Sequence, residues 1–309
     1  MASDRASQPS FYLRDLRDLA VLGGGACVAA VVPSALDGLM VDALIGVQKM
    51  LRGPQMAEAA ALVERVLPER NASGAAIIAE QNQMRMEDFW GRLRGIGPRR
   101  WTPEIEMEGL ERVHAARERG RGAILWATRM GSATAIKQGL YRAGLPLTHL
   151  SRVQHGASTA SRLAVAAVSP LSCRAENKYL RERVRIPLGE SLAYLQQIRG
   201  ALQQNQVVSI FAERTGRNAV EAELLGKPRR FATGAPSIAY LEDAVLLPTH
   251  CFRTGPFRYR VLVEEPIPVD RSLPRKRFAA DAVCELARRY DAQIRRSPAD
   301  WQGWSFWGR

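Results

Sequence analysis

The sequence predicts an α/β protein whose sheet is mixed but mostly parallel and is flanked by helices, with a helical region at the N-terminus. Two short apolar runs, residues 123–128 and 207–212, have the composition of strands that are buried on both faces. Helical patterns alternate with these runs, and this alternation is typical of a parallel sheet. Residues 245–252 and 258–264 are joined by a Thr-Gly-Pro turn, which predicts one antiparallel pair and therefore a mixed sheet.

The chain is predicted to divide into a helical N-terminal region, residues 1–104, and an α/β domain, residues 105–309. Between Met56 and Arg94 the residues Ala, Glu, Leu and Met are plentiful. A turn signal around residues 68–74 divides this stretch into two helices.

Residues 19–36 form an uncharged run of 18 residues, which is near the lower limit for crossing a bilayer. The run contains three consecutive glycines and a proline, and aspartates flank it. We therefore expect a membrane-associating segment that acts as an in-plane or weakly inserted anchor, with a true span and a buried core helix as the alternatives. A secretory signal would have a basic n-region and a shorter apolar core, so secretion is disfavoured.

The other elements of the α/β domain follow in chain order. Helices are expected at residues 133–143, 158–168 and 235–241 and from about Gly189 onward, and a short strand at residues 147–150. The last helix places apolar side chains at every fourth position, namely Phe278, Ala282, Leu286, Tyr290 and Ile294.

The chain is strongly basic, with 44 Lys and Arg against 31 Asp and Glu and a formal charge of +13 at pH 7. Such a surplus attracts polyanions, either nucleic acid or an anionic membrane surface. The basic residues are spread along the chain and no nucleic-acid-binding motif is recognisable, so nucleic acid is not an expected partner. The four cysteines are scattered without a CxxC pair. We therefore expect no metal site, no disulfide framework and a reducing compartment.

Several ordered blocks carry a resemblance to one family. They are residues 111–126, 191–199, 207–214, 225–228, 231–236 and the closing Pro-x-x-Trp segment at 298–307. From about Phe11 to Arg309 the chain resembles the lauroyl and myristoyl acyltransferases that add secondary acyl chains in lipid A biosynthesis. The resemblance implies a glycerolipid acyltransferase-like fold, an acyl carrier protein or coenzyme A thioester as donor, a lipid-like acceptor and no cofactor.

In that family a motif histidine acts as general base on the substrate hydroxyl, and the acidic residue of the His-x4-Glu motif orients it. Aligning Gly131 with the motif glycine places Arg129 at the histidine position and Thr134 at the acid position. Arginine stays protonated at physiological pH and cannot act as a base, and threonine cannot stabilise an imidazolium by charge. Ordinary His-x4-Glu catalysis is therefore excluded, and any acyl transfer needs another arrangement.

His155 is the candidate for a relocated base. It follows the strand predicted at residues 147–150, and such loops gather at one edge of a parallel sheet. The alternative is a solvated or structurally bonded loop histidine. Arg152 resembles the family's basic residue after the second strand, and Glu213 stands where the family carries an aspartate. An ion pair between Arg152 and Glu213 is the alternative to a role in substrate binding.

The remaining histidines are expected to be structural. His149 and His250 lie in or beside predicted strands as hydrogen-bonded residues, and His114 lies on an exposed helix.

Basic residues precede a predicted helix start in the 225–236 block. Lys227, Arg229 and Arg230, together with the backbone at Gly234, are arranged to bind a phosphate group. A solvated basic loop is the alternative.

The C-terminal tail is rich in aromatic residues, Trp301, Trp304, Phe306 and Trp307, and ends at Arg309. These side chains fit an interfacial aromatic belt, and packing against the domain is the alternative.

Two functions follow from these expectations. The first is transfer of a fatty acyl group from a thioester to a lipid-like acceptor at the cytoplasmic face of the inner membrane. The second is an inactive member of the family that binds a lipid or a partner protein, such as an acyl carrier or another enzyme.

Overall fold

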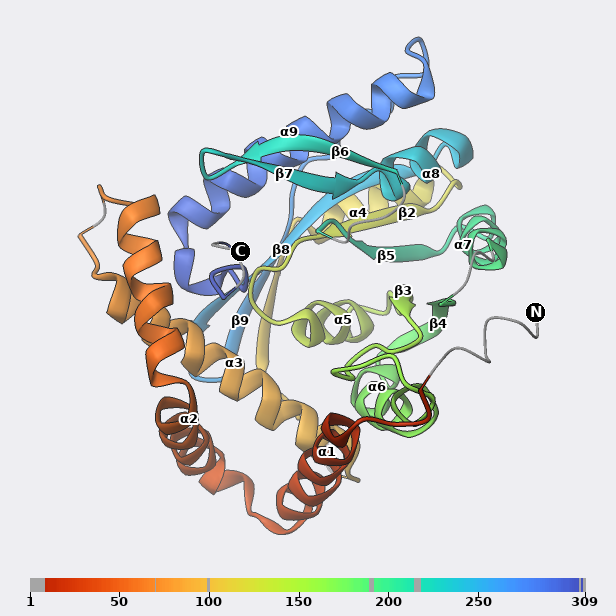
Figure 1. The fold of residues 1–309 in the computed structure, drawn as a ribbon. Coiled ribbons are helices and arrows are strands. Elements are labelled where there is room, and N and C mark those ends of the chain that lie inside the picture. Colours follow the sequence, from red (N-terminus) through yellow and green to blue (C-terminus); the bar gives the residue numbers. More distant parts are fainter. Residues whose placement is uncertain are drawn as a thin grey trace.

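The computed structural model describes residues 9–69, 71–98, 101–188, 192–213, 218–305 and 307. Within them, seven strands form one sheet in the order β1-β9-β8-β2-β5-β3-β4 (Figure 1). The strands are β1 (Glu104–Glu108), β2 (Ala123–Ala127), β3 (Leu147–Arg152), β4 (Leu180–Ile186), β5 (Val207–Phe211), β8 (Val245–Gly255) and β9 (Arg258–Val263). The five strands from β8 to β4 are parallel, whereas β9 is antiparallel to β8. The predicted mixed, mostly parallel sheet is confirmed.

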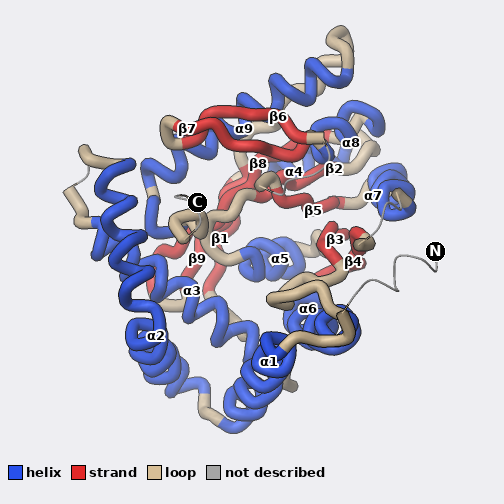
Figure 2. The backbone as a smooth tube through the Cα atoms, viewed as in Figure 1, coloured by secondary structure: helices blue, strands red, loops and turns tan. Residues whose placement is uncertain are grey.

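Helices cover both faces of the sheet (Figure 2). Successive side chains of β2 point to opposite faces of the sheet. Leu125 packs in a cluster with α4 (Leu110–Glu118) and α5 (Ala133–Arg142), whereas Trp126 packs in another cluster. The second cluster includes α7 (Ala193–Gln203), α8 (Gly234–Glu242) and α9 (Arg275–Arg296). All five residues of β2 are buried, as the continuous apolar run predicts.

The N-terminal part of the chain forms a helical layer. It consists of α1 (Leu13–Val31), the short η1 (Ser34–Leu36), α2 (Asp37–Val66) and α3 (Gly74–Ile96), which packs against α6 (Ser169–Asn177). Pro33 follows the end of α1, because it cannot continue the helix. Figure 1 shows α1 and α2 as a V at one end of the molecule.

No single helix among the described residues is long and apolar enough to cross a bilayer. The pair formed by α1 and residues Ser34–Val66 passes a test of length and composition together, but its two arms are bent by 120°.

Two segments differ from the sequence-based expectations, and a third expectation falls on residues that the structure does not describe. The helix expected at residues 158–168 begins later, as the π-helix η2 (Ala164–Val168) that continues into α6. The basic 225–236 block is half of a separate hairpin, β6 (Ala219–Leu224) and β7 (Lys227–Ala232), and not a loop. The expected helix start at Gly189 lies outside the described residues, and α7 begins at Ala193.

Candidate functional site

The parallel strands β2, β5 and β3 lie side by side, so the residues that follow them emerge at one edge of the sheet. Arg129 follows β2, Glu213 follows β5, and His155 follows β3. The topology therefore gathers these three sequence-predicted residues at the carboxyl edge. Arg152, the last residue of β3, is exposed at the same edge.

The loop between β2 and α5 is fixed by backbone geometry and by a cap. Gly131 has a φ of +55°, and a Cβ atom there would lie 2.5 Å from the carbonyl oxygen of Cys251. Ser132 caps α5 because its Oγ accepts a hydrogen bond from the Ala135 N–H at 3.1 Å. The same hydroxyl donates to Asp88 of α3.

Arg129, which the sequence predicts at the position of the motif histidine, forms an ion pair with Glu213. The Nε atom of Arg129 lies 3.7 Å from Oε2 of Glu213, whose side chain is 11% exposed. Tyr290 donates a hydrogen bond to Oε1 of Glu213, and Trp301 Nε1 lies 3.3 Å from the same oxygen. Burial raises the pKa of Glu213, although Tyr290 and Arg129 act against that shift. An ion pair of Glu213 with Arg152 was the alternative to a role in substrate binding; among the described residues Glu213 pairs with Arg129 instead.

Thr134 lies in the first turn of α5 and is buried. No hydrogen bond joins its side chain to Arg129 or Glu213 among the described residues. The structure therefore brings Arg129 and Glu213 together and leaves Thr134 in the core.

The C-terminal tail closes over the β2–α5 loop. Gly131 N donates to the Asp300 carbonyl at 2.8 Å, and Gln302 N donates to the Arg129 carbonyl at 3.0 Å. Trp301, Trp304 and Trp307 are buried, with Trp301 packed edge-on against the other two. The expectation of an interfacial aromatic belt is wrong for these three tryptophans, because they pack inside the domain. Phe306 and Arg309 lie outside the described residues.

Asp300 makes this closure sensitive to pH. Its carboxylate accepts a hydrogen bond from Arg253 N at 2.8 Å, yet burial raises its pKa to about 7. A carboxyl whose pKa rises on folding stabilises the fold fully below its unfolded value, and this stability is lost as the pH rises through about 7.

We expect Asp300→Asn to remove this pH dependence. Between pH 5 and pH 8 the melting temperature of the wild type should fall relative to that of the variant. A loss of about 1–2 kcal/mol in the free energy of unfolding corresponds to a fall of a few degrees. Parallel thermal melts of both proteins across this range test it. Identical pH dependence in the two proteins would contradict the assignment.

The three basic residues of the 225–236 block lie on β7. Arg229 donates to the Trp307 carbonyl at 2.8 Å and stacks over the Trp307 ring at 4.0 Å, whereas Lys227 and Arg230 are exposed. Gly234 begins α8 as expected. The β6–β7 hairpin turns at Leu225 and Gly226, both with positive φ, and this turn is why the block forms a strand.

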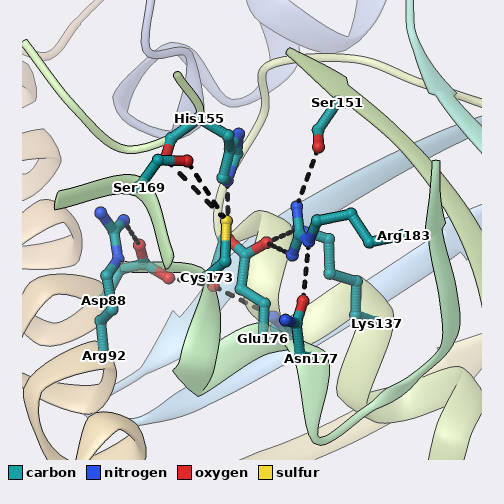
Figure 3. A network of polar contacts seen from close by, with 12 residues as sticks. Asp88, Arg92, Lys137, Ser151, His155, Ser169, Cys173, Glu176, Asn177 and Arg183 are labelled. Atoms are coloured by element: carbon teal, nitrogen blue, oxygen red, sulfur yellow. Dashed lines mark hydrogen bonds and ion pairs between the residues drawn. The ribbon is translucent and has the colours of Figure 1, made fainter. Parts of the chain in front are cut away.

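His155 lies on a second polar cluster at the same sheet edge (Figure 3). Its Nε2 atom is 3.3 Å from Oε1 of Glu176, a residue of α6. The other carboxylate oxygen of Glu176 accepts from Lys137 Nζ at 2.6 Å and from Arg183 Nη2 at 2.7 Å. Arg183 is held in turn by Ser151 at 3.2 Å. Side chains from α5, from β4 and from the loop after β3 thus converge on one buried carboxylate of α6.

The charges of this cluster fix the protonation of His155. Burial would raise the pKa of Glu176, but Lys137, His155 and Arg183 outweigh it and hold the pKa well below its ordinary value. Burial lowers the pKa of His155, although Glu176 acts in the opposite direction. At neutral pH the carboxylate is therefore ionised and the imidazole is neutral, with its proton on Nε2. The lone pair is left on Nδ1, for which the described residues supply no hydrogen bond.

A pocket of about 380 Å³ adjoins His155, lined by residues 152 and 154–160. The His155 side chain remains 19% exposed. Gly156 has a φ of +78°, and a Cβ atom there would meet Ser172 Oγ of α6 at 2.0 Å. The glycine therefore lets the loop press onto α6 and keeps His155 over Glu176.

The structural expectations for the other three histidines are confirmed for two of them and wrong for the third. His250 is buried in β8 with Nδ1 2.8 Å from Thr128 Oγ1, and His114 is exposed on α4. His149 is buried in β3 and close to His155, with ring centroids 6.2 Å apart, but neither of its ring nitrogens has a hydrogen-bond partner among the described residues. The prediction of a hydrogen-bonded His149 is wrong.

Sequence reasoning missed Glu176, Lys137 and Arg183. One signal was present, because Lys137 interrupts the apolar face of a strongly amphipathic helix and so had to find a buried partner. Nothing in the spacing identified Glu176, which lies 39 residues away. Within the described residues, no group of His, Cys, Asp and Glu side chains is arranged to hold a metal ion.

Comparison with known protein families relates part of this chain to one class of enzyme. The mixed sheet with helices on both faces is an α/β fold, and residues 174–304 match the model of the bacterial lipid A biosynthesis acyltransferases. The match supports an acyltransferase-like domain of the lipid A biosynthesis type over this part of the chain. The matched residues include Glu176, Glu213 and the β7 cations, whereas Arg129 and His155 precede them. No curated protein sequence matches the chain.

Proposed function

We propose that the protein transfers a fatty acyl group from a thioester to a hydroxyl or amine of a lipid-like acceptor, with His155 as the general base. One observation carries this proposal: a neutral imidazole is oriented by a buried, ionised Glu176 and borders a pocket. A base oriented by a carboxylate is the arrangement that acyl transfer requires. The family match supports acyl transfer as the reaction type.

In the proposed step the acceptor hydroxyl gives its proton to Nδ1 of His155 while its oxygen attacks the thioester carbonyl carbon. The carbon–sulfur bond then breaks, and the leaving thiolate takes the proton back from His155. No further reactant is needed. Glu176 stabilises the transient imidazolium and stays ionised throughout, since Lys137 and Arg183 hold its charge.

The remaining predicted residues take supporting roles in this proposal. Arg152 lines the same pocket and attracts an anionic group of the donor or acceptor. Arg230 is exposed on β7 four residues before α8 begins at Gly234, where a lipid phosphate can be bound, whereas Lys227 is exposed at the turn end of the same strand. Arg129 and Thr134 do not take part in the chemistry, because the first pairs with Glu213 and the second is buried.

The second candidate function is lipid or partner-protein binding without catalysis. The Arg129–Glu213 ion pair favours it, because a cation occupies the place of the usual base. Both candidates place the protein at the cytoplasmic face of the inner membrane. Acyl carrier protein or acyl-coenzyme A is the proposed donor.

A transfer assay with the purified protein distinguishes the two candidates. Long-chain acyl-carrier-protein and acyl-coenzyme A donors are incubated with a bacterial lipid extract, and labelled lipid is measured across pH. We expect turnover whose acid limb lies below pH 6.5, because burial lowers the pKa of His155 below that value. Binding of the lipids without any turnover would instead establish the second candidate.

A further inference from the structure

The outer face of the V formed by α1 and the first half of α2 is apolar and uncovered. On α1 the exposed side chains recur at helical spacing through Leu13, Leu16, Val21, Val28 and Val31. The face continues onto α2 through Leu39, Val47, Met50 and Leu51. Val31 is 75% exposed and Met50 is 78% exposed. An uncovered apolar area of this extent marks an interaction surface.

The inner face of α1 is also apolar, but it is covered. Leu22, Ala26 and Ala29 are buried in a cluster with Trp90 and Leu93 of α3. A helix that is apolar on all sides is buried in protein or in lipid. Since α3 covers one side of α1, the other side is left for lipid.

A buried ion pair fixes the bend of the V. Arg94 of α3 is 3% exposed and pairs with Asp37, the first residue of α2. The same guanidinium donates to the carbonyl of Ala29 at 2.8 Å and to the carbonyl of Pro33 at 3.2 Å. Trp90 Nε1 donates to Asp37 at 2.7 Å. Straightening α1 and α2 into one spanning helix would strip Arg94 and Asp37 of these partners, at the cost of a buried unpaired charge.

Charges at the two ends of the apolar face match an anionic bilayer. Arg14 and Arg17 are exposed near the start of α1, and Lys49 and Arg52 are exposed on α2. Long basic side chains can extend from an apolar surface to lipid phosphates. Asp42 is exposed on the α2 arm and has to remain at the water interface. This distribution fits a helix pair that lies in one leaflet.

We propose that α1 and the first half of α2 dock onto an anionic bilayer as a rigid, in-plane hairpin, with both arms in one leaflet. The proposal rests on the membrane placement in the proposed function and is independent of whether acyl transfer occurs. Buried in the interface, such a face reaches about 5–10 Å into the bilayer.

The docked hairpin would bring the His155 pocket to the membrane surface. Asp15 of α1 accepts hydrogen bonds from Thr159 Oγ1 at 2.5 Å and from Ser161 Oγ at 2.6 Å. Asp18 accepts from Ser158 N at 2.9 Å. Residues 154–160 line the pocket, so the N-terminal end of α1 holds the pocket wall beside the bilayer. A lipid-borne ligand would then enter without leaving the membrane.

The depth of Cys27 tests this inference. Cys27 is exposed at the middle of the 19–36 run, and of the four cysteines only Cys284 is also exposed. In the full-length Cys284→Ser variant, an environment-sensitive fluorophore on Cys27 is mixed with vesicles of equal parts phosphatidylcholine and phosphatidylglycerol. Spin labels placed near the interface or near the bilayer centre then quench it. We expect a blue shift and stronger quenching by the interfacial label.

The outcomes separate the alternatives. Stronger quenching by the central label would mean a span, since a spanning helix places Cys27 about 15 Å from each interface. A blue shift that depends on protein concentration without vesicles would mean that two hairpins cover each other. Either result, or no response to vesicles, overturns the proposal. The same dye on Cys284 of a Cys27→Ser variant should not respond.

A substitution on the exposed face provides a second readout. We expect Val31→Asp to weaken vesicle binding at least tenfold while leaving the melting temperature unchanged, because Val31 makes little contact with the protein. Leu241→Asp, at a half-exposed position on α8, should bind as the wild type does. Equal binding by all three proteins would overturn the proposal even if the transfer assay succeeds.

Discussion

Replacing Glu176 by glutamine is expected to lower the free energy of unfolding by about 3–5 kcal/mol, because Lys137 and Arg183 then lose their buried counter-charge. Glu176 is 5% exposed and bonds to both cations at 2.6 and 2.7 Å. Its pKa is lowered on folding, so its contribution is complete above its unfolded value near 4.5 and is lost as the pH falls through the folded value.

Chemical denaturation at neutral pH measures this loss, and Glu182→Gln on β4 is the matched control because Glu182 is exposed. Adding Lys137→Met to Glu176→Gln should recover part of the stability, since one unpaired cation is removed. A loss below about 1 kcal/mol, the range of an exposed pair, would show that the cluster is solvated. The difference in free energy of unfolding between Glu176→Gln and the wild type should also become smaller at acidic pH.

Replacing Arg94 by methionine is expected to cost a similar amount, about 3–5 kcal/mol. The substitution leaves Asp37 without its cation and the carbonyls of Ala29 and Pro33 without their donor. The bend between α1 and α2 should loosen first, so amide protons of α1 should exchange faster than those of the sheet. Arg65→Met, at an exposed position of α2, is the control. Unchanged exchange in α1 would show that the bend does not depend on Arg94.

Apolar periodicity predicted the centre of the sheet, because β2, β5 and β8 are buried on both faces and read as continuous apolar runs. It failed at the sheet edges. β4 contains four charged residues in Leu180–Ile186 and lies at one edge, and the basic strand β7 pairs with β6 in a separate hairpin. Such strands are held by neighbours that no local pattern contains.

The helix η2 before α6 starts later than expected because of contacts with a distant part of the chain. Ser158 and Thr159 were expected to be helical, but they bond to Asp18 and Asp15 of α1 instead. Those contacts join residues more than 100 positions apart, and no spacing rule anticipates them. The proposed helical region 1–104 and α/β domain 105–309 stay a prediction, although Ile77 and Ile78 of α3 share a core cluster with the sheet.

The site was predictable only in part. Parallel strands with known carboxyl ends place Arg129, His155 and Glu213 at one edge, and the sequence excluded the usual motif pair. The ion-pair partners could not be predicted, because Glu213 pairs with Arg129 and not with Arg152, the partner that was considered for it. The partner of His155, Glu176, lies in α6, which follows the helix expected at residues 158–168 and was not itself predicted.

In the proposed function, His155 carries out the acyl-transfer chemistry in place of the residue at the motif position. The most direct measurement compares transfer rates of His155→Gln and Arg129→Gln, with His114→Gln as the exposed-histidine control. We expect a loss of about 10²–10⁴-fold in the transfer rate of His155→Gln, near-wild-type rates in the other two variants, and unchanged melting temperatures in all three. Full activity in His155→Gln together with lost activity in Arg129→Gln would contradict it.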